Sequence, residues 1–161
     1  MDEIATTLLA TDGSQQANDA LVTGLAVIGA ARPLVLVTVV EPTDPSLVVG
    51  GGHAGPVMTP DDKQRWLRDR DAAGRQVLDE ALAALRRDDV EAIVLEGDPG
   101  REICRFAETG RVGLIVLATT GRGGLKRAML GSVSDHVVRN APCPVLTVGP
   151  AATEPGVGGR S

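Results

Sequence analysis

Aromatic residues are almost absent from the sequence, whose 161 residues include one Phe, one Trp and no Tyr. Proteins that bind single-stranded nucleic acid stack bases on aromatic side chains, so this scarcity argues against that function. With 43% hydrophobic residues the chain has enough material for a core, which must be built from Leu, Val, Ile and Ala. The length is that of a single domain.

The sequence also lacks a positive charge excess and a long hydrophobic run. Its 16 basic and 21 acidic residues give a net charge of −5, which argues against general binding to nucleic acid or to anionic membranes. No apolar run approaches the roughly 20 residues that span a bilayer, and the acidic start Met1-Asp2-Glu3 lacks the basic segment of a signal peptide. Two cysteines, Cys104 and Cys143, are too few for a disulfide framework. We therefore predict a cytoplasmic protein without a nucleic-acid or membrane partner.

What the sequence does contain is a regular alternation of short aliphatic runs and segments with helical spacing. Most of the runs are continuously apolar, as in strands that are covered on both faces. They occupy residues 4–11, 33–40, 90–96, 113–118 and 144–148. Strands that alternate with helices imply right-handed crossovers and a parallel sheet. The predicted fold is a single doubly wound α/β domain with helices on both faces of the sheet.

Local signals indicate where the helices begin. Apolar residues recur at intervals of three and four over 17–28 and again over 66–85. Asp98-Pro99 is typical of an N-cap followed by Pro at the first helical position. Residues 132–135 read Ser-Val-Ser-Asp, the spacing of a capping box, so we expect the last helix to be capped by Ser132.

Two segments do not fit the alternation. Residues 41–60 hold four Gly and four Pro, which predicts a mobile loop. Residues 149–161 are small, polar and rich in Gly and Pro, which predicts a disordered tail after a domain that spans residues 1–148.

Ligands of an open α/β sheet bind beyond the carboxyl ends of the strands, and the densest candidate patch follows the fourth run. Four glycines, at 121, 123, 124 and 131, let backbone N–H groups approach a phosphate closely, and the patch ends at a helix N-terminus that favours negative charge. The same stretch carries Arg122, Lys126 and Arg127 and no acid. The alternative is a glycine-rich turn with solvated basic residues before an ordinary helix.

Two polar side chains have a similar pair of interpretations. Asp12 follows the first run and could accept hydrogen bonds from a ribose hydroxyl or an adenine amino group, or else Asp12 or Ser14 caps the first helix. Ser132 could donate to a phosphate or cap the last helix.

His53 and His136 have no Cys or Glu at ligand spacing and are interpreted as solvent-facing or packing residues. No P-loop, dinucleotide fingerprint or nucleophile elbow is present, which favours a binding site over a strongly catalytic one.

Together these segments resemble the universal stress protein family. The resemblance rests on Leu8-Leu9-Ala10-Thr11-Asp12-Gly13-Ser14, on the glycine-rich block 121–134 and on the closing residues 141–148. The ATP-binding branch of that family carries G-x2-G-x9-G-[ST], of which Gly121 and Gly131-Ser132 supply the second half. Ala118 stands at the first glycine, and Gly113 stands where the family usually has an acid, a departure that we expect to affect packing.

The resemblance implies a strand order of 3-2-1-4-5, a homodimer through the final strand and ATP as ligand, with Mg²⁺ expected to accompany it. The implied homodimer strand consists of Val145, Leu146, Thr147 and Val148. The implied ATP-binding residues are Ala10, Thr11, Asp12, Val39, Val40, Ala118, Gly121, Arg122, Gly123, Gly131, Ser132, Val133 and Ser134.

The function expected from this resemblance is ATP-dependent regulation in a stress response, with unidentified protein partners and at most slow ATP hydrolysis, not enzymatic turnover. An alternative is an interaction module without nucleotide, which the substitution of Ala118 for glycine favours. A third interpretation, an ATP-using adenylyl transferase or sulfur-inserting enzyme, requires S-G-G-x-D-S after the first strand, and residues 10–14 do not supply it.

Overall fold

The computed structural model describes residues 5–29, 32–42, 59–120 and 130–150. They form one five-stranded sheet in the order β3-β2-β1-β4-β5, and every neighbouring pair is parallel. The strands are β1 (Thr6–Ala10), β2 (Leu34–Val40), β3 (Val90–Glu96), β4 (Val112–Ala118) and β5 (Val145–Val148). The predicted sheet and its strand order are confirmed.

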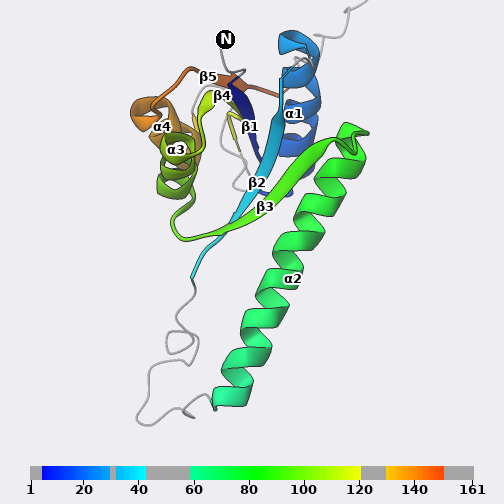
Figure 1. Ribbon diagram of the computed structural model, residues 1–161, viewed down its shortest axis with the longest axis vertical. Coiled ribbons are helices and arrows are strands. Elements are labelled where there is room, and N and C mark those ends of the chain that lie inside the picture. Colours follow the sequence, from blue (N-terminus) through cyan, green and yellow to red (C-terminus); the bar gives the residue numbers. More distant parts are fainter. Residues whose placement is uncertain (1–4, 30–31, 43–58, 121–129, 151–161) are drawn as a thin grey trace, which may run out of the picture.

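Helices cover both faces of this sheet, as predicted. They are α1 (Gln15–Ile28), α2 (Pro60–Leu85), α3 (Pro99–Thr109) and α4 (Ser132–Asn140). Figure 1 shows α1 and α2 on one side of the strands and α3 and α4 on the other. The N-terminal half of α2 extends well beyond the sheet (Figure 1).

The core is aliphatic, as the composition requires, and has a layer on each face. One layer joins α1 and α2 to the sheet through Leu9, Leu21, Leu36, Leu78, Ala81 and Val116. The other joins α3 and α4 to the sheet and includes Leu8, Val37, Ile103, Ala107, Ile115 and Val137. The two aromatic residues, Trp66 and Phe106, are only partly buried.

Glycines bring two helices close to the sheet. A Cβ atom on Gly24 of α1 would lie 2.6 Å from Cγ1 of Val116, and one on Gly74 of α2 would lie 2.9 Å from Cγ1 of Val94. Both distances are shorter than ordinary van der Waals contact. Gly24 therefore serves packing, although it interrupts the apolar stripe of α1.

The N-cap residue predicted from the sequence is confirmed for α3 and is wrong for α4. Asp98 caps α3, since its Oδ1 accepts from the Arg101 N–H at 3.0 Å, with Pro99 at the first position. The predicted cap of α4 is wrong, because Gly131 is the N-cap residue and Ser132 is already helical. The reason is a hydrogen bond of 2.8 Å from the Gly131 N–H to the Thr119 carbonyl oxygen, which makes Gly131 the last extended residue.

A capping box occurs instead at the start of α2. The Thr59 hydroxyl oxygen accepts from the Asp62 N–H at 3.1 Å, and Asp62 Oδ2 accepts from the Thr59 N–H at 3.4 Å. Most of the predicted loop, residues 43–58, and the tail from 151 onward lie outside the described residues. Among the residues that are described, no helix is long and apolar enough to cross a membrane.

Candidate functional site

A cavity of about 630 Å³ opens at the carboxyl ends of the central strands. The sequence-predicted site residues that the structure describes all line it: Ala10, Thr11, Asp12, Val39, Val40, Ala118, Gly131, Ser132, Val133 and Ser134. Three other predicted residues, Gly121, Arg122 and Gly123, lie outside the described part of the chain. The structure therefore brings together residues that are separated by more than a hundred positions in the sequence.

The turn between β1 and α1 fixes the carboxylate of Asp12. Its Oδ1 accepts from the Ser14 N–H at 2.9 Å and from the Ser14 hydroxyl at 2.7 Å. Ser14 caps α1 by accepting from the Ala17 N–H at 3.2 Å. Thr11, which is buried, accepts from the Gly13 N–H at 3.0 Å. Ser14 is thus the helix cap, and Asp12 both orients that cap and contributes a carboxylate to the cavity wall.

A pair of hydrogen bonds joins the end of β4 to the start of α4. The Thr119 carbonyl oxygen accepts from the Gly131 N–H at 2.8 Å and from the Ser134 hydroxyl at 2.8 Å. Ser134 is 3% exposed, and its hydroxyl oxygen also lies 3.0 Å from the Gly131 carbonyl oxygen. The Ser134 hydroxyl therefore donates its proton to a backbone carbonyl oxygen of the protein itself. Ser132, which is exposed, presents the nearby hydroxyl at the cavity.

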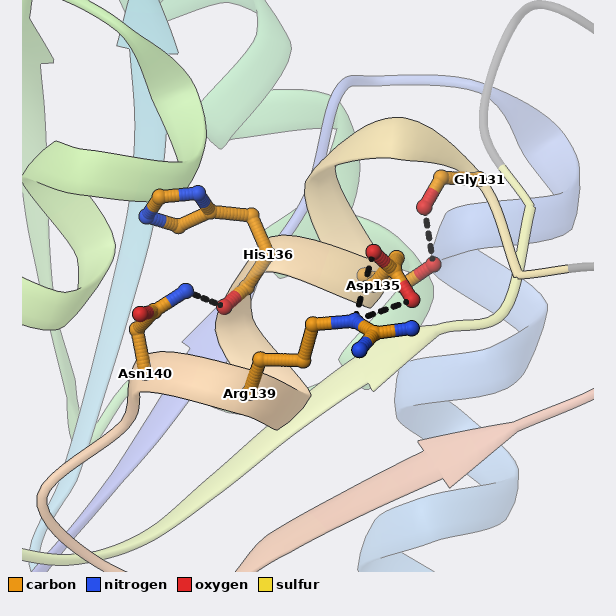
Figure 2. Close-up of polar contacts among 6 residues, drawn as sticks. Gly131, Asp135, His136, Arg139 and Asn140 are labelled. Carbon is orange, nitrogen blue, oxygen red and sulfur yellow. Dashed lines mark hydrogen bonds and ion pairs between the residues drawn. The ribbon is translucent and has the colours of Figure 1, made fainter.

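The N-terminus of α4 favours an anion at the cavity. The amides of the first turn of a helix point out of its N-terminus without intrahelical partners, and the helix dipole adds partial positive charge there. Gly131 has no side chain to accept from those amides. The acid of the first turn, Asp135, is paired with Arg139, whose Nε lies 3.0 Å from each carboxylate oxygen (Figure 2).

His136 packs between helices and is not part of the cavity lining. Figure 2 shows its ring pointing toward α3, and a Cβ atom on Gly100 of that helix would lie 2.8 Å from the ring. The Asn140 side-chain amide donates to the His136 carbonyl oxygen at 2.7 Å (Figure 2). Of the two interpretations offered by the sequence, solvent-facing or packing, the structure shows packing for His136.

Sequence reasoning missed the walls that the helices supply. These residues are Ala17 of α1, Arg70, Ala73, Gly74 and Val77 of α2, and Pro99 and Ile103 of α3. Strand ends can be recognised from apolar runs, whereas the face that a long helix turns to a cavity depends on its tertiary packing. The sequence did contain one local signal for this wall: Trp66 and Arg70 are four residues apart, a spacing that places both side chains on the same face of a helix. In the structure the Arg70 guanidinium lies 5.1 Å from the centre of the Trp66 ring.

Neither cysteine shows the features of a reactive nucleophile. Burial, with smaller contributions from Glu108 and Cys143, raises the pKa of the Cys104 thiol. Burial also raises the pKa of Cys143. Both are free thiols, and a raised pKa lowers the thiolate fraction at neutral pH. No group of three or more His, Cys, Asp or Glu side chains suited to a metal ion occurs within the described ranges.

Solved structures with the same fold include several universal stress proteins. UspA from Lactobacillus plantarum is 20% identical, with 92% of this chain and 99% of that chain covered and a TM-score of 0.68. A protein of the family from Arabidopsis thaliana with AMP bound is 19% identical, with coverages of 92% and 93% and a TM-score of 0.58. A universal stress protein in complex with cAMP is 23% identical, with coverages of 89% and 95% and a TM-score of 0.56. At these identities the likeness establishes the fold.

Sequence relatives point to the same group of proteins. Universal stress protein MJ0531 of Methanocaldococcus jannaschii is 54% identical over 55 residues, which are 34% of this chain and 32% of that protein. Universal stress protein YxiE of Bacillus subtilis is 42% identical over 77 residues, 47% of this chain and 52% of that protein. The chain thus matches about a third to a half of the length of these curated relatives. The family model for the universal stress protein family matches residues 4–149, and the chain belongs to that family.

Proposed function

We propose that the cavity binds ATP or another adenine nucleotide and that the protein acts as a nucleotide-dependent regulator in a stress response. The observation that carries this proposal is the placement of Asp12 and of the α4 N-terminus on the wall of one cavity. The Asp12 carboxylate suits a ribose hydroxyl or an adenine amino group. The helix N-terminus suits the phosphates.

Cavity size and lining support this assignment. A volume of 630 Å³ falls within the range of roughly 300–1,000 Å³ that small-molecule sites occupy. Val39 and Val40 supply an apolar wall beside Asp12, and the backbone of Val39 is proposed to meet the adenine ring. The phosphates are assigned to Gly131, Ser132 and Val133 together with residues 121–123. The longer stretch 121–132 carries three basic residues, Arg122, Lys126 and Arg127.

The ligands of related proteins favour an adenine nucleotide. The family member from Arabidopsis thaliana was solved with AMP bound, and another universal stress protein was solved with cAMP. Both ligands contain adenine, ribose and phosphate, which are the three groups that the cavity wall is proposed to meet. ATP, accompanied by Mg²⁺, remains our specific prediction among such nucleotides.

Regulation is favoured over catalysis by the chemistry of the described cavity lining. Among these residues there is no His or Cys, and the Ser134 hydroxyl proton is already donated to a backbone carbonyl oxygen. Hydrolysis is therefore proposed to be slow at most. A cytoplasmic location stays a prediction from the sequence.

We also propose that two copies associate through β5. This strand is the last in the sheet order and pairs with β4 on one side. Its four residues are only partly buried in the single chain. An edge strand of this kind presents backbone donors and acceptors to a second strand.

The proposed phosphate position can be tested by placing a negative charge on it. Ser132→Glu introduces a carboxylate at the first position of α4, where an acid stabilises the helix by about 0.3–1 kcal/mol. We therefore expect a folded protein whose ATP affinity, measured by calorimetry, falls at least about 30-fold because a carboxylate repels phosphate.

The matched control is Gln64→Glu, which adds the same charge on an exposed part of α2 away from the cavity. This control should bind ATP within about twofold of the unmodified protein, since separated surface charges are largely screened. Unchanged affinity in Ser132→Glu would remove the phosphates from the α4 N-terminus. Absence of ATP binding by the unmodified protein would instead favour the interaction module.

A further inference from the structure

Arg70 lies in the wall of the cavity at the end remote from α4. It belongs to α2 and is fixed to Glu96, the last residue of β3. In the sheet, β2 and β1 lie between β3 and β4, the strand that leads to α4. An adenine nucleotide with its phosphates at the α4 N-terminus would therefore have its nucleoside part nearer to Arg70.

Contacts with Glu96, Asp71 and Trp66 position the Arg70 side chain, which is 14% exposed; its Nη2 lies 3.8 Å from Oδ1 of Asp71. Its Nη1 and Nη2 donate to Oε1 and Oε2 of Glu96 at 3.0 and 2.7 Å, a paired geometry that sets the plane of the guanidinium. The same group lies over the ring of Trp66. Gly74, one turn further along α2, lets the helix approach β2 and β3 closely. These contacts place the Arg70 guanidinium at the cavity wall.

The charges at this end of the cavity do not favour a phosphate. Glu96 neutralises the positive charge of Arg70, and two further acids, Asp12 and Glu41, line the cavity. A phosphate group near them would meet excess negative charge. An uncharged group with hydrogen-bond acceptors fits this end better.

The Arg70 guanidinium has hydrogen-bonding capacity left for such a group. It carries five N–H donors, of which the two hydrogen bonds to Glu96 use two. Its Nε–H is buried and has no acceptor among the described residues. Buried donors without acceptors are rare and costly in folded proteins. Because Nε is enclosed, the guanidinium must tilt toward the cavity before a ligand acceptor can reach this donor.

We propose that Arg70 is a specificity-determining residue that donates its Nε–H to an acceptor on the purine base of the nucleotide. The edge of a purine offers such acceptors, N7 in adenine and N7 and O6 in guanine. This inference rests on the proposed nucleotide site and adds the group that recognises the base. The tilt of Arg70 on binding changes its position over Trp66.

The lone Trp makes the proposal directly measurable. Because the chain has no Tyr and no second Trp, its fluorescence reports on Trp66. Titration of the full chain with AMP should change this emission saturably. Arg70→Ala should lower the AMP affinity about 5- to 20-fold and abolish the emission change, in the range of a lost charge-assisted hydrogen bond. Arg68→Ala, an exposed position on the same helix, should bind AMP within about twofold of the unmodified chain.

Arg70→Lys separates recognition from structural support. Lysine keeps the positive charge beside Glu96 and the apolar stem of the side chain, but it has no Nε–H in a planar group. We expect this variant to keep its unfolding temperature within about 3 °C of the unmodified protein. Its AMP affinity should fall as in Arg70→Ala.

Each alternative result overturns a defined part of the account. Unmodified AMP affinity in Arg70→Ala or in Arg70→Lys overturns the role of Arg70 and leaves the nucleotide site standing. AMP binding without a change in Trp66 emission also overturns it. If calorimetry shows no AMP or ATP binding by the unmodified chain, the proposed function and this inference both fail.

Discussion

The hydroxyl of Ser134 ties two ends of the candidate site together. It donates to the Thr119 carbonyl oxygen, which also accepts from the Gly131 N–H, and it is almost completely buried. Thr119 in turn donates its own N–H to the Val148 carbonyl oxygen at 2.9 Å, so β4, β5 and α4 meet at one residue. Ser134 therefore positions the N-terminus of α4, and Ser132 is the exposed serine of the cavity lining.

Removal of the Ser134 hydroxyl should loosen this junction. We expect Ser134→Ala to lower the free energy of unfolding by about 1 kcal/mol, the usual net value of one hydrogen bond. Amide exchange of Gly131 should become faster, because its acceptor is less firmly held. Denaturant unfolding and hydrogen exchange measure both effects. Ser132→Ala, at an exposed position, should stay within about 0.5 kcal/mol, and an equal loss in both variants would contradict this role for Ser134.

Residue-level roles were the hardest to predict from the sequence. The spacing of 132–135 matched a capping box, but the cap is Gly131, because a hydrogen bond from a distant strand end decides where α4 begins. The departure at Gly113 was predicted to affect packing, and a Cβ atom there would lie 2.4 Å from Cβ of Ala5. That prediction, which came from the departure from the family pattern, agrees with the structure, since there is no room for a side chain at this position.

The elements are held to the sheet by close helix contacts that glycine permits. Gly24 lies in the middle of α1 and is buried against Val116, which is itself fully buried. Strands and helix segments could be predicted from apolar runs and helical spacing, since burial on two faces imposes those patterns. The cavity wall on α2 could not, because it depends on how a helix of 26 residues lies across the ends of β2 and β3.

A large side chain at Gly24 should push α1 away from the sheet. Gly24→Leu is expected to lower the free energy of unfolding by about 2 kcal/mol or more, because overpacking outweighs the gain in helix propensity. Ala26→Leu adds a leucine to an exposed position of the same helix and should change stability by less than about 0.5 kcal/mol. Midpoints of urea unfolding compare the two. Equal midpoints would show that α1 does not pack through Gly24.

The start of α2 should be sensitive to acid. Hydrogen bonds with the Thr59 hydroxyl and N–H hold the pKa of the Asp62 carboxyl below its ordinary value of 3.8. Since the unfolded chain then binds this proton more tightly than the folded one, the stabilisation is present above about pH 4 and is lost as the pH falls through the folded-state pKa.

We therefore expect amide exchange in the first turn of α2, corrected for the intrinsic effect of pH, to increase below about pH 4. In Asp62→Asn this additional pH dependence should disappear. The last turn of α3 lies away from the capping box and serves as an internal reference in the same spectra. If Asp62→Asn keeps the pH response of the unmodified protein, the capping box is not its cause.

At the scale of the whole molecule, β5 is one of the two edge strands of the sheet, the other being β3, and it is the edge that we propose pairs with a second copy. The carbonyl oxygens of Pro144 and Val148 accept from the Ile115 and Thr119 N–H groups of β4 and the turn after it. The N–H and C=O of one strand residue point to the same side, so Thr147, next to Val148, directs its N–H to the open edge.

Thr147→Pro should separate the proposed homodimer without disturbing the chain itself. Proline removes the outward N–H, and proline is tolerated where the donor of an edge strand faces away from the sheet. Light scattering should give the mass of two chains for the unmodified protein and of one chain for Thr147→Pro. Thr147→Val, which keeps the N–H, should remain dimeric. A monomeric unmodified protein, or a dimeric proline variant, would remove β5 from the interface.

The central claim is that the cavity at the strand ends holds an adenine nucleotide, and calorimetric titration with ATP and Mg²⁺ tests it most directly. The protein is first unfolded, freed of small molecules and refolded, and the released fraction is analysed by mass spectrometry. The account predicts saturable heat with one nucleotide per chain and a Kd in the micromolar range, equivalent to about −8 kcal/mol at 1 μM. A refolded protein that gives no heat at millimolar ATP and releases no adenine nucleotide would contradict it.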